Sequence, residues 1–331
     1  MSPGTDGTLH VPARDIPLPT TVSRAARAMM TMVQALPAAK VPPAQDLDAW
    51  RAFVSRRGDS PEVTRGMALA CSGFVDTGVK AEVEEIQDAG AIVYAATPEG
   101  LASDAEQVYL HVHGGAWVDG GGPAGRLGAV FAAGSLGRRV WGVDYRMPPE
   151  HPFPAGLDDC VAAYRALLRD HHPASIAVGG ISAGGNLVAG MLLRLHDEGL
   201  PMPAAAVLNS PVADLIQAGD SWRTCPAPQD LGEHVRLYAG GHDLREPYLS
   251  PLFGEIPPGY PPTILISGTR DFLLSDTVRM HRALRTAGCR ADLHVFEGAP
   301  HGMFSGQAPE DHQQVAEVRR FLDEVWKDSQ S

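Results

Sequence analysis

Cysteine and aromatic residues are both scarce in this chain of 331 residues, which has four cysteines and 6% aromatic residues. The cysteines lie too far apart to form a metal-binding or redox motif. A strand that leads into a glycine turn explains the pair His111 and His113 better than a shared metal ion does. We therefore expect no metal site, no cofactor and isolated or buried thiols at Cys71, Cys160, Cys225 and Cys289.

Long apolar runs are absent as well. No stretch reaches the roughly 18 residues that a transmembrane helix needs, and the polar start of the chain lacks the apolar core of a secretory signal. The sequence thus predicts a cytoplasmic protein with no membrane partner. The net charge of −12 argues against nucleic acid and anionic lipid as partners, and it mildly favours neutral or cationic substrates.

Strand and helix patterns alternate along most of the chain. The length and a hydrophobic content of 44% suffice for one large α/β domain with an accessory layer. The alternation predicts a mostly parallel sheet covered by helices on both faces. Strands are expected at 82–97, 105–113, 138–145, 175–179, 204–208, 262–268 and 291–297, and helices at 157–170, 187–195, 275–287 and 309–326.

Two segments differ from this alternation. Before about residue 81 the pattern is helical only, with amphipathic helices predicted at 23–36 and 47–57. We therefore assign residues 1–75 to an N-terminal helical cap and 76–331 to the catalytic domain. A second cap insertion is expected at about 212–246, where an irregular segment follows a strand. The glycines at 120–122 are expected to form a flexible loop beside the site.

Ser182 is the strongest candidate for a catalytic residue. It lies in Gly180-Ile181-Ser182-Ala183-Gly184, with an apolar strand pattern before it and a helical pattern after it. This is the context of a nucleophile elbow, a sharp strand-to-helix turn that exposes the serine hydroxyl. The small flanking glycines allow the backbone to turn tightly there.

A serine nucleophile needs a base and an acid that orients the base, and both candidates follow Ser182 in the order typical of such hydrolases. His301 lies in a Gly/Pro-rich loop after a strand pattern and is the expected base. Asp271 lies just past the C-terminal end of a predicted buried strand, where open α/β sheets place site residues. Asp276 is its competitor, although it is more typical of the first turn of a helix.

The turn His113-Gly114-Gly115-Ala116-Trp117 follows another predicted strand. Glycines allow backbone N–H groups to approach a ligand closely, so this turn is predicted to stabilise an oxyanion. A further N–H is expected from the residue after the nucleophile. The predicted oxyanion hole comprises Gly114, Gly115, Ala116 and Ala183.

Together these motifs resemble those of the hormone-sensitive-lipase-like branch of the α/β-hydrolases, the bacterial family IV esterases. In three places the chain departs from the family pattern. Ala116 replaces a third glycine, although it keeps the N–H, and Ile181 stands where Asp or Thr is common. The segment 272–276 after Asp271 lacks the proline that is common there. The resemblance runs from about residue 80 to the end of the chain. It rests on His113-Gly114-Gly115, 180–186, Asp271, His301, Asp144-Tyr145-Arg146, 149–155 and Ser250-Pro251-Leu252.

The resemblance implies a serine carboxylesterase with an α/β-hydrolase fold, acting on small-molecule esters of short-to-medium acyl chains as a monomer or homodimer. A lactonase or amidase using the same site, and a non-catalytic ligand receptor on this fold, are the alternatives. Trp117, Ile181, Met30 and Trp222 are candidates for the substrate pocket. Methionines on the first predicted helix either form a lid over an acyl chain or pack as ordinary core.

Overall fold

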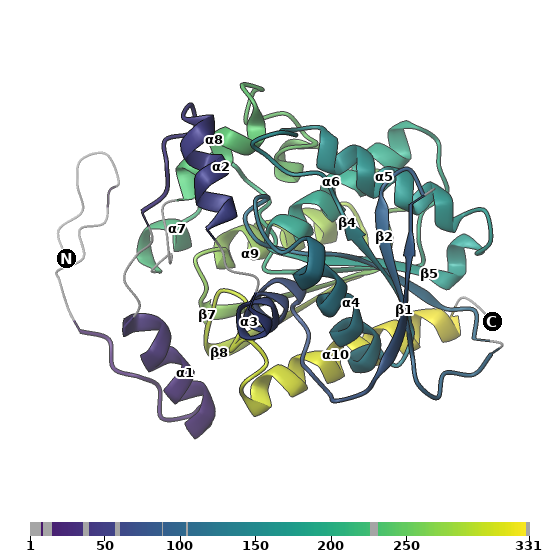
Figure 1. Ribbon diagram of the computed structural model, residues 1–331, viewed down its shortest axis with the longest axis horizontal. Helices are drawn as coiled ribbons and strands as arrows, with labels where there is room; N and C mark the ends of the chain where they lie inside the picture. The colour runs from purple at the N-terminus through teal and green to yellow at the C-terminus, as the bar shows by residue number, and fades with distance from the viewer. Residues whose placement is uncertain are drawn as a thin grey trace.

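A single sheet of eight strands organises the protein (Figure 1). The computed structural model describes residues 8, 15–35, 40–56, 60–87, 89–103, 105–225 and 231–328. The strands are β1 (Ala81–Ile86), β2 (Ile92–Pro98), β3 (Val108–Val112), β4 (Arg139–Asp144), β5 (Ile176–Ile181), β6 (Ala205–Asn209), β7 (Thr263–Arg270) and β8 (Ala291–Pro300).

The strand order is β1-β2-β4-β3-β5-β6-β7-β8. Strands β1 and β2 pair antiparallel, β2 pairs antiparallel with β4, and all the other neighbours are parallel. Because the strands from β3 to β8 point the same way, the loops that follow them meet at one edge of the sheet. The predicted fold class, a mostly parallel α/β-hydrolase sheet, is confirmed.

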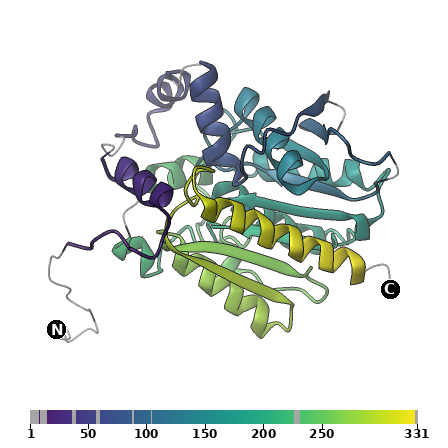
Figure 2. The same cartoon turned by 90° about the horizontal axis from the view of Figure 1, so that it is seen from below.

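Helices cover both faces of the sheet. Helices α5, α6 and α9 pack on one face, and α3, α4 and α10 pack on the other; Figure 2 shows α10 running along the sheet toward the C-terminus. The helices are α1 (Arg24–Ala35), α2 (Leu47–Ser55), α3 (Pro61–Ser72), α4 (Gly122–Leu136), α5 (Ala155–Leu167), α6 (Ala183–Asp197), α7 (Ser221–Thr224), α8 (Leu231–Ala239), α9 (Leu274–Thr286) and α10 (Pro309–Asp328).

Two hydrophobic cores result, one on each face. Successive strand residues alternate between them, because neighbouring side chains of a strand point to opposite faces. Leu110 and Val178 join the core under α5, α6 and α9, whereas Tyr109 and Ala177 join the core under α3, α4 and α10. Both faces of the central strands are therefore apolar, which explains their nearly continuous hydrophobic runs.

Three sequence-based expectations need correction. Residues 82–97 do not form one strand but the antiparallel pair β1 and β2, since the chain reverses near Gly90, whose φ is +80°. Helix α3 was not expected, although Ser60 caps its first turn and the left-handed Gly73 ends it. The glycines at 120–122 are not a flexible loop, because Gly121 caps α4 and Gly122 begins it.

The N-terminal helices occupy separate places. Helix α1 contacts α10 and β8, and α3 belongs to the core against α4. Helix α2 packs against α8 of the insertion, where Trp50 lies fully buried with Leu237 and Val118. In Figure 1, α1, α2, α7 and α8 all lie on the left side of the molecule, away from the C-terminus. Among the described helices, none combines the length and the apolar character needed to cross a membrane.

The contact between α2 and α8 can be tested with Trp50→Ala. Trp50 is 0% exposed, so its truncation should lower the free energy of unfolding by about 3 kcal/mol. The matched control is Arg51→Ala on the same helix, whose side chain is 50% exposed and makes surface ion pairs only. Urea unfolding should show a much smaller change for the control. Equal stability of both variants would contradict the buried contact.

Candidate active site

Ser182 stands between β5 and α6, at the position that caps the helix. Its backbone has φ 57° and ψ −119°, a conformation that costs energy for a residue with a side chain and persists only where the surrounding structure fixes it. The Ser182 N–H donates to the carbonyl of Asn209 at 2.9 Å. The strained turn lifts the serine side chain out of the sheet, as a nucleophile elbow does.

Glycine is required on both sides of this serine. A Cβ on Gly180 would lie 2.5 Å from the carbonyl carbon of Gly184, and a Cβ on Gly184 would lie 2.1 Å from the oxygen of Val112. Both distances are far below any real contact with backbone atoms. The turn can therefore approach β3 this closely only with hydrogen atoms at these two positions.

The structure brings Ser182, Asp271 and His301 together, each as the first residue after a parallel strand. His301 Nδ1 lies 3.1 Å from Asp271 Oδ1, and His301 Nε2 lies 2.9 Å from Ser182 Oγ. A carboxylate only accepts hydrogen bonds, so Nδ1 carries the proton. Nε2 then accepts the hydrogen bond of the serine hydroxyl, which is the arrangement that a general base needs.

Asp271 is completely buried, with its side chain 0% exposed. Burial raises its pKa, but the charge and hydrogen bond of His301, together with hydrogen bonds from Ser210 and the Leu273 N–H, lower the pKa below its ordinary value. The Ser267 hydroxyl also donates to its second oxygen at 2.9 Å. Asp271 therefore stays ionised and can stabilise a protonated imidazole.

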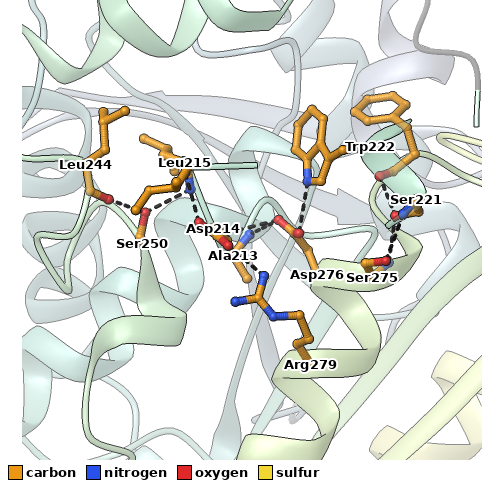
Figure 3. Close-up of polar contacts among 12 residues, drawn as sticks. Ala213, Asp214, Leu215, Ser221, Trp222, Leu244, Ser250, Ser275, Asp276 and Arg279 are labelled. Carbon is orange, nitrogen blue, oxygen red and sulfur yellow. Dashed lines mark hydrogen bonds and ion pairs between the residues drawn. The ribbon is translucent and has the colours of Figure 1, made fainter. Parts of the chain in front are cut away.

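Asp276, the competing acid, points toward Ala213, Asp214 and Trp222 (Figure 3). Its carboxylate accepts hydrogen bonds from the Ala213 and Asp214 N–H groups and from the indole of Trp222. Burial raises its pKa to about 6, against the opposing effect of these hydrogen bonds. Two carboxylates five positions apart thus have pKa values shifted in opposite directions, and only Asp271 contacts the histidine.

The predicted oxyanion turn has an unusual backbone. Gly115 has φ +105°, and a Cβ there would lie 2.3 Å from the oxygen of Asp119. Ala116 and Trp117 also have positive φ, at 51° and 61°. Among the described residues, no hydrogen bond engages the N–H groups of Gly115, Ala116 or Ala183. These three donors are therefore available to a ligand beside Ser182.

Gly114 needs correction as a predicted donor. Its N–H already donates to the carbonyl of Cys71 at 2.7 Å, so it is engaged with the end of α3. A Cβ on Gly114 would lie 3.4 Å from the Cβ of Ser182. Gly114 therefore allows the turn to approach the serine closely, and its N–H does not bind the ligand.

His111 on β3 and His113 in the turn after it are buried packing residues. His113 stacks on Tyr145 with ring centroids 4.3 Å apart, and the Tyr145 hydroxyl donates to the His113 carbonyl. Burial lowers the pKa of His111 to about 3, so it is neutral at physiological pH. Within the described ranges, no three His, Cys, Asp or Glu side chains are grouped as metal ligands.

Three of the four predicted pocket residues lie in the core. Trp117 is 1% exposed and stacks on Tyr238, with centroids 4.5 Å apart. Ile181 and Met30 are similarly buried, at 1% and 3% exposed. The pocket assignment of these three residues is thus corrected. Trp222 is half-buried and packs on Phe272.

An open cavity of about 500 Å³ lies between α1 and α3. Two methionines of the first helix, Met29 and Met32, line it together with Leu69, and Ser305 and Gln307 form its polar side. Neither Ser182 nor His301 lines this cavity. Of the methionines on this helix, Met30 packs in the core, whereas Met29 and Met32 line a cavity away from Ser182, so a lid over an acyl chain stays a prediction.

Several supporting residues were not anticipated from the sequence. Ser210 directly follows β6, and it contributes to lowering the pKa of Asp271. The buried Asn186 donates to the carbonyls of Val212 and Leu249, both at 2.8 Å, and so ties the nucleophile helix to the loops after β6. Position after a strand was the available signal for Ser210. Nothing local in the sequence identifies the distant partners of Asn186.

Comparison with known proteins agrees with this geometry. The family model described as the alpha/beta hydrolase fold matches residues 109–305. An acetyl-hydrolase of Streptomyces hygroscopicus is 37% identical over 186 residues, which cover 54% of this chain and 62% of that protein. The chain therefore spans less than two thirds of that relative's length.

Solved structures match over more of the chain. The crystal structure of an esterase, E25, has a TM-score of 0.82 at 36% identity and covers 95% of this chain and 98% of that one. The crystal structure of an esterase from the bacterial hormone-sensitive lipase family has a TM-score of 0.72 at 30% identity, covering 92% and 99%. The chain belongs to the α/β-hydrolase family and, within it, to the hormone-sensitive-lipase-like esterases. The expected family and class of enzyme are both confirmed.

The raised pKa of Asp276 predicts a pH-dependent stability. Between its ordinary pKa of 3.8 and about 6, the folded protein holds a proton that the unfolded chain has released, so this residue stabilises the fold as the pH falls through 6. Between about pH 7.5 and about pH 5, the free energy of unfolding of the native protein should rise by about 1.4 kcal/mol relative to that of Asp276→Asn. Urea unfolding of both proteins at about pH 7.5 and about pH 5 measures it. A difference that grows with rising pH would contradict the assignment.

Proposed function

We propose that this protein hydrolyses carboxylic esters of short-to-medium acyl chains, with Ser182, His301 and Asp271 as a catalytic triad. The observation that carries the proposal is the continuous hydrogen-bonded series from Ser182 Oγ through His301 to Asp271, at 2.9 and 3.1 Å. The N–H groups of the turn beside Ser182 supply the donors that an oxyanion would need. Base, orienting acid and oxyanion donors thus surround one hydroxyl.

In the first half of the reaction, Ser182 Oγ attacks the ester carbonyl carbon while His301 Nε2 takes the hydroxyl proton. The carbonyl oxygen becomes an oxyanion, and the N–H groups of Gly115, Ala116 and Ala183 bind it. The tetrahedral intermediate then breaks its bond to the alcohol oxygen. His301 gives the proton to that oxygen, and the alcohol leaves an acyl-enzyme on Ser182.

In the second half, a water molecule replaces the alcohol. His301 removes a proton from the water as its oxygen attacks the acyl carbon, and the same N–H groups bind the new oxyanion. When the intermediate collapses, His301 returns the proton to Ser182 Oγ and the carboxylic acid departs. Asp271 remains ionised throughout and stabilises the imidazolium that forms twice in the cycle.

The substrate class follows from three observations. A relative with 37% identity is named an acetyl-hydrolase, which favours a small acyl group. The site needs no charged partner on the substrate, and the net charge of −12 disfavours anionic ones. Helices α1, α2, α7 and α8 lie on one side of the molecule, where we infer that they form the cap predicted from residues 1–75 and 212–246.

Ser182→Ala tests the nucleophile. Its kcat with p-nitrophenyl acetate or butyrate should fall by at least about a thousandfold, since the covalent step is lost. A fluorophosphonate should label the native protein on the peptide containing Ser182, as measured by mass spectrometry, and should not label the variant. The control is Ser55→Ala, an exposed serine on α2. Unchanged turnover in Ser182→Ala would contradict the proposal.

The identity of the acid can be tested with a matched pair of variants. Asp271→Asn should lower kcat by roughly a thousandfold or more, because an amide cannot accept the Nδ1 proton and stabilise the imidazolium in the same way. Asp276→Asn removes a carboxylate that is also buried and lies nearby in the first turn of α9, and its effect should be far smaller. Steady-state kinetics on one ester decide between them. The reverse order of effects would make Asp276 the acid.

A further inference from the structure

The start of the insertion is fastened to the turn that carries Asp271 (Figure 3). Ser221 and Ser275 bond each other twice, with each backbone N–H donating to the other's hydroxyl at 3.0 and 2.8 Å. The Ser221 hydroxyl also donates to the carbonyl of Phe272 at 2.7 Å. A Cβ on Gly219 would lie 2.4 Å from the Cβ of Ser275, so the two segments are in direct contact.

Asp276 is the polar centre of this contact. One of its oxygens accepts the N–H groups of Ala213 and Asp214, at 3.0 and 3.1 Å. The other oxygen accepts the indole N–H of Trp222 at 3.0 Å. The carboxylate is 0% exposed, so each of these donors would be left unsatisfied without it. One side chain thus fixes both the loop after β6 and the indole of α7.

The Trp222 indole, which Asp276 holds, contacts the Phe272 ring, and the Phe272 ring contacts the imidazole of His301. The ring centroids of Trp222 and Phe272 are 5.1 Å apart, and those of Phe272 and His301 are 4.6 Å apart. Phe272 is 1% exposed, and both ring pairs are tilted, with interplanar angles of 56° and 48°. The imidazole therefore contacts a buried phenyl ring, which in turn contacts the indole.

We propose that Asp276 is a positioning residue for His301, acting by holding Trp222 against Phe272 and so fixing the plane of the imidazole. This inference rests on the proposed function, because it assigns Asp276 a part in the same reaction. Asp276 touches neither Ser182 nor His301 in the structure. It acts entirely through the indole and the phenyl ring.

The step most sensitive to this support is proton donation to the departing alcohol. A p-nitrophenolate leaves without a proton, whereas an alkoxide leaves only if His301 protonates it. A loosened imidazole would retain its role toward Ser182 Oγ, which it contacts directly, while losing alignment with the leaving oxygen. Esters of poor leaving groups should therefore suffer more than esters of good ones when Asp276 or Trp222 is changed.

The experiment compares acetate esters that differ only in the alcohol. In Asp276→Asn, an amide nitrogen replaces one carboxylate oxygen and cannot accept a hydrogen bond. The variant therefore loses either the bond from the indole or the bonds from the two backbone N–H groups. Trp222→Phe keeps an aromatic ring but removes the indole donor. In each, the ratio of kcat/KM for ethyl acetate to that for p-nitrophenyl acetate should fall by about fivefold. Assays at about pH 8 keep the carboxylate ionised.

The double variant Asp276→Asn with Trp222→Phe tests whether both residues act through one bond. Its ratio should fall no further than that of either single variant, because an interaction already lost cannot be lost again. The control is Arg279→Met on the same helix, which breaks the ion pair with Asp214 and not the bond to Trp222. It should lower the unfolding midpoint while leaving the ratio unchanged.

Tryptophan fluorescence gives a readout that needs no catalysis. Subtracting the spectrum of Trp222→Phe from that of the native protein isolates Trp222 among the five tryptophans. In Asp276→Asn, this emission should shift to longer wavelength and acrylamide should quench it more strongly. If the native protein hydrolysed no ester, the proposed function would fail, yet the spectra would still report whether Asp276 holds the indole.

An unchanged leaving-group ratio in both single variants would overturn the proposal, whatever the spectra show. Equal losses for ethyl and p-nitrophenyl acetate would also overturn it, since they indicate a general structural role. If Asp276→Asn does not fold, Trp222→Phe alone decides by its ratio. A lowered ratio in Trp222→Phe with an unchanged ratio in Arg279→Met supports the proposal.

Discussion

The close contact between the β3 backbone and the start of α6 is the constraint on which the site depends. A Cβ on Gly184 would meet the carbonyls of Val112 and His113 at 2.1 and 2.4 Å, so the helix begins directly against the strand. The same strand continues into Gly114, which approaches Ser182 from the other side. Close backbone contacts therefore place Ser182 relative to the turn that carries the N–H groups of Gly115 and Ala116.

The residues of the candidate site were predictable because their positions follow from local patterns. Ser182, Asp271 and His301 each come directly after a strand, and parallel strands end at one edge of a sheet. The pocket was not predictable in this way. Whether Trp117 faces a substrate or the core depends on Tyr238, which lies far along the chain and stacks on it. Burial of Met30 likewise depends on its neighbours in the folded protein, and not on its place in a helical pattern.

Glycine explains the elements that the sequence pattern did not reveal. Helix α4 contains several glycines, which lower helix propensity, but they permit close packing: a Cβ on Gly134 would lie 2.6 Å from Thr77 Oγ1, and one on Gly128 would lie 3.3 Å from the Cβ of Ser72. Tertiary contact outweighs propensity here. The antiparallel pair β1 and β2 was missed for a different reason, since the short turn between the two strands is marked mainly by Gly90, whose φ is +80°.

The insertion is attached on two sides, and the two attachments differ in kind. Toward the N-terminal segment, α8 packs on α2 through buried Trp50, and Glu233 accepts the N–H of Ala44 at 2.7 Å. Toward the sheet, α7 bonds the segment that follows Asp271. The Ser221 hydroxyl donates to the Phe272 carbonyl, and the Trp222 indole donates to Asp276. The first attachment is mainly apolar packing with one hydrogen bond, from the Ala44 N–H to Glu233. The second consists of directional hydrogen bonds among buried groups, which hold α7 in one position relative to the turn that follows Asp271.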